Sequence, residues 1–126
     1  MLKHCKRGLK DIPDEVIEGA LSHGLRFSSK VEMYEVYDDD VLIGICGFSF
    51  NKSCVFTKNL YVLPNHRKKG YGDRILKWMI WKIKTESYSK VIKATCTPMS
   101  LPIYLKNGFK ICGEYRNGNK NVFLLI

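Results

Sequence analysis

Short runs in the first half of the chain alternate apolar and polar residues with a period near two. These runs cover residues 31–37, 41–50 and 55–62, and they are rich in β-branched and aromatic side chains, which predicts strands. The polar segments Asp38-Asp39-Asp40 and Asn51-Lys52-Ser53 separate them and are typical of turns. We therefore expect three consecutive antiparallel strands.

Helical spacing of apolar residues appears at two places. Pro13-Asp14-Glu15 places a proline and two acids in the first turn of a short helix that ends near Gly24. The longest helix is expected over residues 71–86, where the apolar side chains share one face. The members of that face are Ile75, Leu76, Met79, Ile80 and Ile83.

The last third of the chain predicts a buried strand, a short helix and a hairpin. The strand covers residues 91–96, and the helix covers residues 100–107 and stops at Gly108. The final strands, residues 109–115 and 121–126, flank an Asn-Gly turn. Strand, helix and strand in succession predict that residues 55–62 and 91–96 are parallel, joined by a right-handed crossover with a ligand crevice at the strand ends.

Composition bounds these expectations. A chain of 126 residues with 45% hydrophobic residues predicts one folded domain spanning residues 1–126. No apolar run approaches the ~20 residues that span a bilayer, and the basic N-terminus lacks the apolar segment of a secretory signal. The five cysteines are an odd number without Cys-x-x-Cys spacing, so we expect reduced thiols, no metal site and a cytoplasmic protein.

Charge is distributed unevenly along the chain. Residues 1–50 contain six Lys/Arg and nine Asp/Glu, a formal charge of −3, whereas residues 51–126 contain 15 and three, a formal charge of +12. The second segment is expected to face an anion. A polyphosphate cofactor, nucleic acid and an acidic protein surface remain open as partners, as does a merely solvated lysine-rich surface.

The most informative segment is Val62-Leu63-Pro64-Asn65-His66-Arg67-Lys68-Lys69-Gly70-Tyr71-Gly72, between a predicted strand and the longest helix. Its glycines permit a sharp turn and close backbone approach to an anion. The free amides of a helix start and the flanking cations add attraction. This segment therefore predicts a phosphate-binding loop, with a lysine-rich surface loop as the alternative.

Two separated signatures resemble the GNAT superfamily of acyl-CoA N-acetyltransferases. One is the Val62-x-Pro64-x-x-Arg67-Lys68-Lys69-Gly70-Tyr71-Gly72 loop, and the other is Tyr104-Leu105-Lys106-Asn107-Gly108-Phe109. The element order from about residue 31 onward is also similar to that family. The resemblance implies an α/β (α+β) fold: a mixed, mostly antiparallel twisted sheet of about six to seven strands with a parallel central pair and about three helices.

The resemblance also implies a site. The cosubstrate would be acetyl-CoA, held by the backbone of Tyr61 and Val62 along its pantetheine arm and by the amides of residues 67–72 at its pyrophosphate. The tyrosine of the second signature, Tyr104, would act as the general acid. The full set of expected cofactor-binding residues is Tyr61, Val62, Arg67, Lys68, Lys69, Gly70, Tyr71 and Gly72.

The chain departs from the family at several positions. Phe56, Lys58 and Asn59 stand where many members carry a glutamate base, so no general base is assigned; a water, Glu35 or Glu114 remain open. Two further departures affect expected cofactor contacts. Asp73 replaces a hydroxyl residue and opposes a phosphate, and Thr97 replaces an asparagine.

We expect an acetyl-CoA-dependent N-acetyltransferase that acetylates a primary amine by direct attack in a ternary complex. Alternatives are a nucleic-acid-directed acyltransferase and a non-catalytic module that binds coenzyme A or nucleic acid. A small amine, a protein lysine or an N-terminus could be the acceptor, and the acidic Asp38-Asp39-Asp40 turn could attract any of them. Neither the acyl chain length nor the oligomeric state follows from the sequence.

Overall fold

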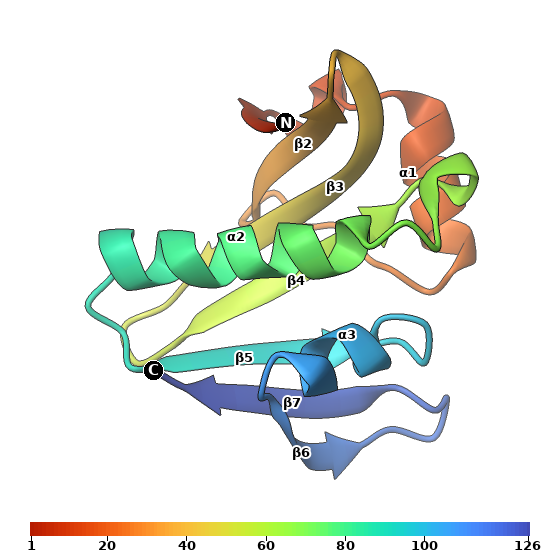
Figure 1. The fold of residues 1–126 in the computed structure, drawn as a ribbon. Coiled ribbons are helices and arrows are strands. Elements are labelled where there is room, and N and C mark those ends of the chain that lie inside the picture. The colour runs from red at the N-terminus through yellow and green to blue at the C-terminus, as the bar shows by residue number, and fades with distance from the viewer.

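The computed structural model describes residues 1–126 as a single seven-stranded sheet flanked by helices (Figure 1). The strands are β1 Leu2–Arg7, β2 Glu32–Asp38, β3 Val41–Phe50, β4 Val55–Val62, β5 Val91–Cys96, β6 Lys110–Glu114 and β7 Lys120–Leu125. The helices are α1 Asp14–Ser22, α2 Tyr71–Glu86 and α3 Leu101–Lys106, with 3-10 turns at Leu9–Asp11 and Pro64–His66. The mixed α/β fold with three helices is confirmed.

The strand order is β1-β2-β3-β4-β5-β7-β6, and β4–β5 is the only parallel pair. That pair is short: Val55 lies opposite Ile92 and Phe56 opposite Lys93, and the pairing then ends. Figure 1 shows the two strands diverging toward the N-terminal end of α2. The parallel central pair is thus confirmed, and its divergence leaves one edge of β4 without a strand partner.

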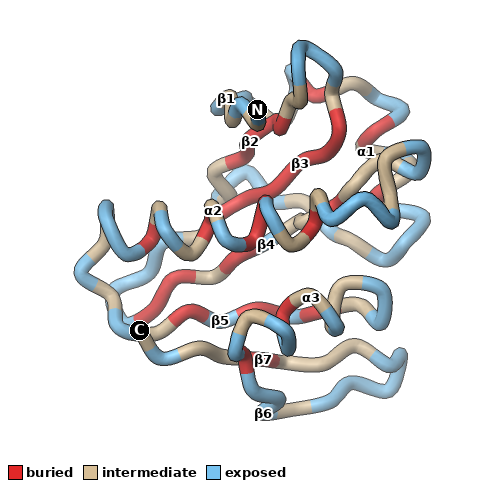
Figure 2. Tube along the Cα trace, in the orientation of Figure 1, coloured by how far each residue is buried: buried red, intermediate tan, exposed pale blue.

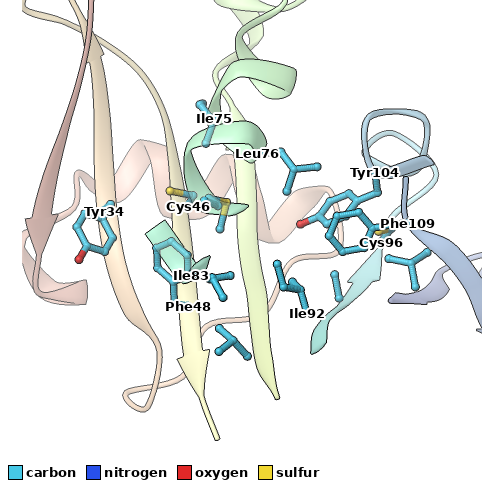
Figure 3. Close-up of a cluster of buried hydrophobic side chains, with 14 of the residues drawn as sticks. Tyr34, Cys46, Phe48, Ile75, Leu76, Ile83, Ile92, Cys96, Tyr104 and Phe109 are labelled. Carbon is cyan, nitrogen blue, oxygen red and sulfur yellow. The ribbon is translucent and has the colours of Figure 1, made fainter. Parts of the chain in front are cut away.

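Helices cover both faces of the sheet. On one face, the apolar side of α2 packs on the central strands, and Tyr104 of α3 and Phe109 join the same cluster (Figure 3). On the other face, Val16 and Ala20 of α1 pack against a smaller cluster that includes Tyr61. Buried residues are concentrated on the central strands and on the inner side of α2 (Figure 2). No helix combines the length and apolarity needed to cross a bilayer.

Strand β1 was not among the expected strands. Its sequence, Leu-Lys-His-Cys-Lys-Arg, is too polar for a clear strand pattern, and it pairs only with β2 at the sheet edge. The His4 ring stacks on Trp78 of α2 at a centroid distance of 3.8 Å. This strand therefore depends on long-range pairing and stacking rather than on its own periodicity.

A bulge in β4 positions the site. Asn59 adopts φ +55°, and the β3–β4 register shifts at this point. The Asn59 amide donates to the Arg26 carbonyl at 2.7 Å, which ties the segment after α1 to the strand. Because the bulge reverses the side-chain alternation, Thr57 lies on the α2 face of the sheet, whereas Tyr61 lies on the α1 face.

Candidate functional site

The glycine loop, residues 67–72, presents a row of free backbone amides. Gly70 precedes α2 with φ +82°, and Lys68 has φ +62°. The first amide of this region that bonds within the helix is that of Arg74, which donates to the Gly70 carbonyl at 3.2 Å. The amides of residues 68–73 donate to no backbone or side-chain acceptor in the protein, so they form an anion-binding nest at the helix start.

The Arg67 side chain is held against the end of β4. Its Nε donates to the Val62 carbonyl at 2.9 Å, and its guanidinium lies 5.2 Å from the centroid of the Tyr61 ring. Its Nη2 is buried without a hydrogen-bond partner. A buried guanidinium nitrogen without an acceptor is costly, so this donor fits a site built to receive an anionic group.

These residues border a cavity of about 480 Å³, here called the glycine-loop cavity. Its lining includes Tyr61, Val62, Arg67, Lys68, Gly70, Tyr71 and Gly72, together with Leu25, Leu60, His66, Asp73, Thr97, Met99, Ser100, Pro102, Ile103 and Lys106. Lys69 is exposed and does not line it. The structure thus brings together all expected cofactor-binding residues except Lys69.

The negative charge of Asp73 was expected to disfavour binding of a phosphate beside it, and the structure shows how this charge is compensated. Its carboxylate accepts hydrogen bonds from Lys77 at 2.5 Å and from Asn107 at 2.8 Å, and Lys106 lies 3.8 Å away. The hydrogen bonds from Lys77 and Asn107 lower the pKa of Asp73 below its usual value. Asp73 therefore links α2 to α3 as part of a compensated ion cluster.

The Asp38-Asp39-Asp40 turn lies beside the glycine loop. Asp38 accepts a hydrogen bond from the Tyr71 hydroxyl at 2.5 Å, and this bond raises the pKa of Tyr71. None of the three acids lines the glycine-loop cavity. Asp38 is thus engaged by the glycine loop itself, and attraction of an amine acceptor by this turn stays a prediction.

A second cavity of about 420 Å³ lies between the segment after α1 and the β6–β7 hairpin, and we call it the hairpin cavity. It is lined by Gly24, Leu25, Arg26, Phe56, Thr57, Lys58, Asn59, Thr95, Thr97, Tyr115, Asn117 and Asn119. The two cavities share Leu25 and Thr97. They therefore meet where β4 and β5 diverge, so molecules bound in each could touch there.

Tyr104 is 3% exposed and lines neither cavity. Its hydroxyl lies 2.7 Å from Thr57 Oγ1, and Thr57 lines the hairpin cavity. Burial raises the pKa of Tyr104 well above its usual value, so the phenol stays protonated. Sequence reasoning missed Thr57, which lies between Phe56 and Lys58 on the strand before the loop.

Glu35 and Glu114, the two carboxylates considered as the general base, lie outside both cavities. Glu35 is buried against Arg7, whose Nε is 2.8 Å from it, and accepts a hydrogen bond from Tyr37 at 3.1 Å. Glu114 pairs with Lys120 on the β6–β7 hairpin. Neither glutamate lines either cavity. No carboxylate of the protein is thus placed to take a proton directly within the hairpin cavity.

The cysteines do not contribute to the site. All five are free thiols, and none lines either cavity. Cys46 and Cys96 are buried in β3 and β5 as small apolar residues. Burial raises the pKa of Cys96 to about 12, which keeps it a thiol and removes its nucleophilicity.

Comparison with known proteins agrees with this fold. Mutant forms of the spermidine/spermine N-acetyltransferase SpeG from Vibrio cholerae superpose with a TM-score of 0.75 at 13% identity, over 99% of this chain and 95% of theirs. The N-acetylglutamate synthase of Neisseria gonorrhoeae, complexed with coenzyme A and N-acetyl-glutamate, gives a TM-score of 0.79 at 17% identity, over 99% of this chain and 35% of its own. A search of curated proteins finds no match to the sequence.

A GNAT family acetyltransferase from Elizabethkingia anophelis with acetyl-CoA bound gives a TM-score of 0.72 at 16% identity, over 99% of this chain and 98% of its own. At such identities the structural likeness shows the fold alone. The family is shown by the sequence: the model of the GNAT acetyltransferase domain matches residues 29–111, more than half of the chain. With its glycine loop, diverging strands and paired cavities, this chain belongs to the GNAT family of acetyltransferases.

Proposed function

We propose that the protein transfers an acetyl group from acetyl-CoA to a primary amine. The observation that carries this proposal is the junction of the two cavities at Leu25 and Thr97. One cavity contains an anion-binding nest and the other opens to solvent between a hairpin and a loop. A donor and an acceptor bound on opposite sides of the diverging strands would meet at this junction.

The residues present fit coenzyme A. The free amides of residues 68–73 and the unpartnered Nη2 of Arg67 supply donors for a diphosphate. The edge of β4 that β5 leaves unpaired, around Tyr61 and Val62, offers backbone groups to an amide-bearing arm. When bound, acetyl-CoA supplies an activated acetyl thioester. Structures of the family with acetyl-CoA or coenzyme A bound agree with this assignment.

The transfer proceeds directly from thioester to amine. The amine nitrogen bonds to the acetyl carbonyl carbon, the carbon–sulfur bond breaks, the nitrogen loses a proton and the sulfur gains one. No cysteine lines either cavity, and burial suppresses the nucleophilicity of Cys46 and Cys96. The protein's own side chains therefore favour a ternary complex over an acetylated enzyme.

Tyr104 and Thr57 form the proton-donating pair. The phenol is fully buried and protonated, and its hydroxyl contacts Thr57 at 2.7 Å. Thr57 in turn lines the hairpin cavity. In the proposed relay, the Thr57 hydroxyl gives its proton to the departing thiolate and receives one from the Tyr104 hydroxyl. In this proposal Thr57 contacts the reacting atoms and Tyr104 supplies its proton, since either hydroxyl of the pair can donate in their hydrogen bond.

Two measurements test the proposal. Calorimetry with acetyl-CoA should show saturable binding that weakens when Gly70 is replaced by valine, because φ +82° disfavours a β-branched residue. Initial rates with an amine panel should give intersecting double-reciprocal lines when both substrates are varied. Parallel lines would indicate an acetylated enzyme, and absence of turnover with any amine would refute the proposed reaction.

A second candidate is a non-catalytic protein that binds coenzyme A. It is favoured by one observation, the lack of a carboxylate or histidine lining the hairpin cavity. Saturable acetyl-CoA binding without acetyl transfer to any amine or protein would establish this alternative.

A further inference from the structure

The hairpin cavity has a positive lining. Arg26 and Lys58 are its charged residues, and no Asp or Glu lines it. Neither cation forms an ion pair in the protein. Lys58 is exposed, with its Nζ 5.5 Å from the centroid of the Phe56 ring. Both charges are therefore available to a molecule that enters the cavity.

Two further cations are near in the fold to lining residues of the hairpin cavity, although neither lines it. Lys93 lies opposite Phe56 in the short parallel pair and is exposed. Arg116 is also exposed and lies in the hairpin between the lining residues Tyr115 and Asn117. Neither forms an ion pair. Their charges add to those of Arg26 and Lys58 in a field that attracts an anion and repels a cation.

The neutral polar residues of the cavity also suit an anionic ligand. Asn117 and Asn119 carry amide groups that can donate to an oxyanion. The Asn59 amide is already committed to the Arg26 carbonyl at 2.7 Å, which holds the backbone of this arginine at the cavity wall. Hydrogen-bond donors from β4, from the segment after α1 and from the β6–β7 hairpin thus line the same cavity.

We infer that the acceptor is a small amine that also carries an anionic group, a carboxylate or a phosphate, bound by Lys58 and Arg26 while its amine points to the Leu25–Thr97 junction. This inference rests on the proposed function, because it identifies the acceptor of that reaction. The nearby cations also favour the neutral, deprotonated amine that attacks, which suits a cavity without a carboxylate base.

The inference excludes polyamines as preferred acceptors. A diamine brings a second positive charge into a cavity whose charged residues are Arg26 and Lys58, and like charges there disfavour binding. The net charge of the chain could not make this distinction, because a positive charge attracts an anionic cofactor and an anionic acceptor alike. The positive charges at the hairpin cavity favour an anionic acceptor over a polyamine.

The test uses acceptor sets matched in length. Each set holds an amino acid, its carboxamide and the diamine of equal length: 4-aminobutanoate, 4-aminobutanamide and 1,4-diaminobutane, with shorter and longer sets beside it. Phosphoethanolamine against ethanolamine asks whether phosphate replaces carboxylate. We expect kcat/KM for the best anionic amine to exceed that for its uncharged counterpart about tenfold. Equal or faster turnover of carboxamides or diamines would overturn the inference and leave the acetyltransferase proposal intact.

The variant Lys58→Gln assigns the effect to the cavity. It should lower kcat/KM for the anionic acceptor about five- to tenfold through KM, and change the carboxamide rate by less than about twofold. Lys52→Gln is the matched control, because Lys52 is exposed on the β3–β4 turn and lines neither cavity. Equal losses for charged and uncharged acceptors in Lys58→Gln would overturn the assignment.

Binding gives a readout that does not depend on turnover. Saturation-transfer NMR of 4-aminobutanoate and phosphoethanolamine, with coenzyme A present, should show binding that weakens in Lys58→Gln and not in Lys52→Gln. Such binding without turnover of any amine would support the inference about the cavity and refute the proposed reaction. Absence of both binding and turnover would refute both.

Discussion

The Tyr104 hydroxyl lies 2.7 Å from Thr57 Oγ1, although the two residues are 47 positions apart in the sequence. Tyr104 is enclosed in the core, T-shaped against Phe109 at 4.9 Å, and has no direct access to either cavity. Thr57 connects it to the hairpin cavity. The pair therefore joins the apolar core to the place where β4 and β5 diverge.

Removing either hydroxyl of this pair should slow catalysis. Tyr104→Phe is expected to lower kcat by about 100-fold, with the dissociation constant for acetyl-CoA changed by less than about twofold. Thr57→Val leaves the Tyr104 hydroxyl buried without a partner and should also lower the unfolding free energy by about 1 to 3 kcal/mol. Steady-state kinetics and urea unfolding measure the two effects.

The fully exposed Tyr88 provides the control for that pair. Tyr88→Phe should match the wild type in both measurements. If Tyr104→Phe weakened acetyl-CoA binding and stability as much as kcat, Tyr104 would be a packing residue only.

Gly44 and Gly47 of β3 should tolerate alanine differently. A Cβ on Gly44 would lie 2.5 Å from the backbone carbonyl oxygen of Tyr61, whereas one on Gly47 would meet the side chains of Val31 and Met33 at 2.6 and 2.8 Å. The Val31 and Met33 side chains can move aside at little cost, whereas displacement of the β4 backbone disturbs the sheet. Gly44→Ala should destabilise by about 2 to 3 kcal/mol and weaken acetyl-CoA binding, because Tyr61 and Val62 line its cavity.

Gly47→Ala is the internal comparison for that variant. It should reduce stability by less and leave acetyl-CoA affinity unchanged, as measured by thermal unfolding and calorimetry. Unchanged acetyl-CoA affinity in Gly44→Ala would mean that the Tyr61–Val62 backbone does not contact the cofactor.

Asn59 should be required for acceptor binding through Arg26. Asn59→Ala removes the hydrogen bond to the Arg26 carbonyl and places alanine at φ +55°, a combined loss of about 1 to 3 kcal/mol. Asn59→Gly removes the bond and relieves the dihedral. Both should raise KM for the acceptor, and glycine should restore part of the stability. An unchanged acceptor KM in both variants would contradict this positioning role.

His4 should make stability depend on pH below neutrality. Burial, followed by the charge of Lys82, lowers the pKa of His4 from 6.5 to about 4. Between these values the unfolded chain binds more protons than the folded protein, so the free energy of unfolding falls as the pH falls from about 6.5 to about 4. Because the ring is half-buried, we expect a loss of about 1 kcal/mol.

Urea unfolding at several pH values measures this loss. His4→Phe keeps an aromatic ring against Trp78 and removes the titration, so the difference in stability between variant and wild type should grow toward pH 4. A difference that is constant over this range would show that His4 does not titrate differently on folding.

Local periodicity located most of the elements. Residues 71–86 were expected as the longest helix and form α2, Tyr71–Glu86, because their apolar face repeats within the helix itself. The expected helix at 100–107 forms α3, Leu101–Lys106. Strand β1 was missed because an edge strand with polar residues acquires its conformation from β2 and from the Trp78 ring.

The candidate site likewise has one part that the local sequence predicts and one part that only the tertiary structure creates. The glycine loop could be read from neighbouring residues, because φ +82° at Gly70 and the free amides that follow it are properties of one short segment. The hairpin cavity could not, because it assembles Arg26, Lys58 and Asn117 from three distant segments. Which cations face an acceptor, and that Thr57 connects Tyr104 to it, depends on how far β4 and β5 diverge after Phe56. That divergence depends on sheet pairing and on the β4 bulge, which are long-range interactions that no short stretch of the chain specifies.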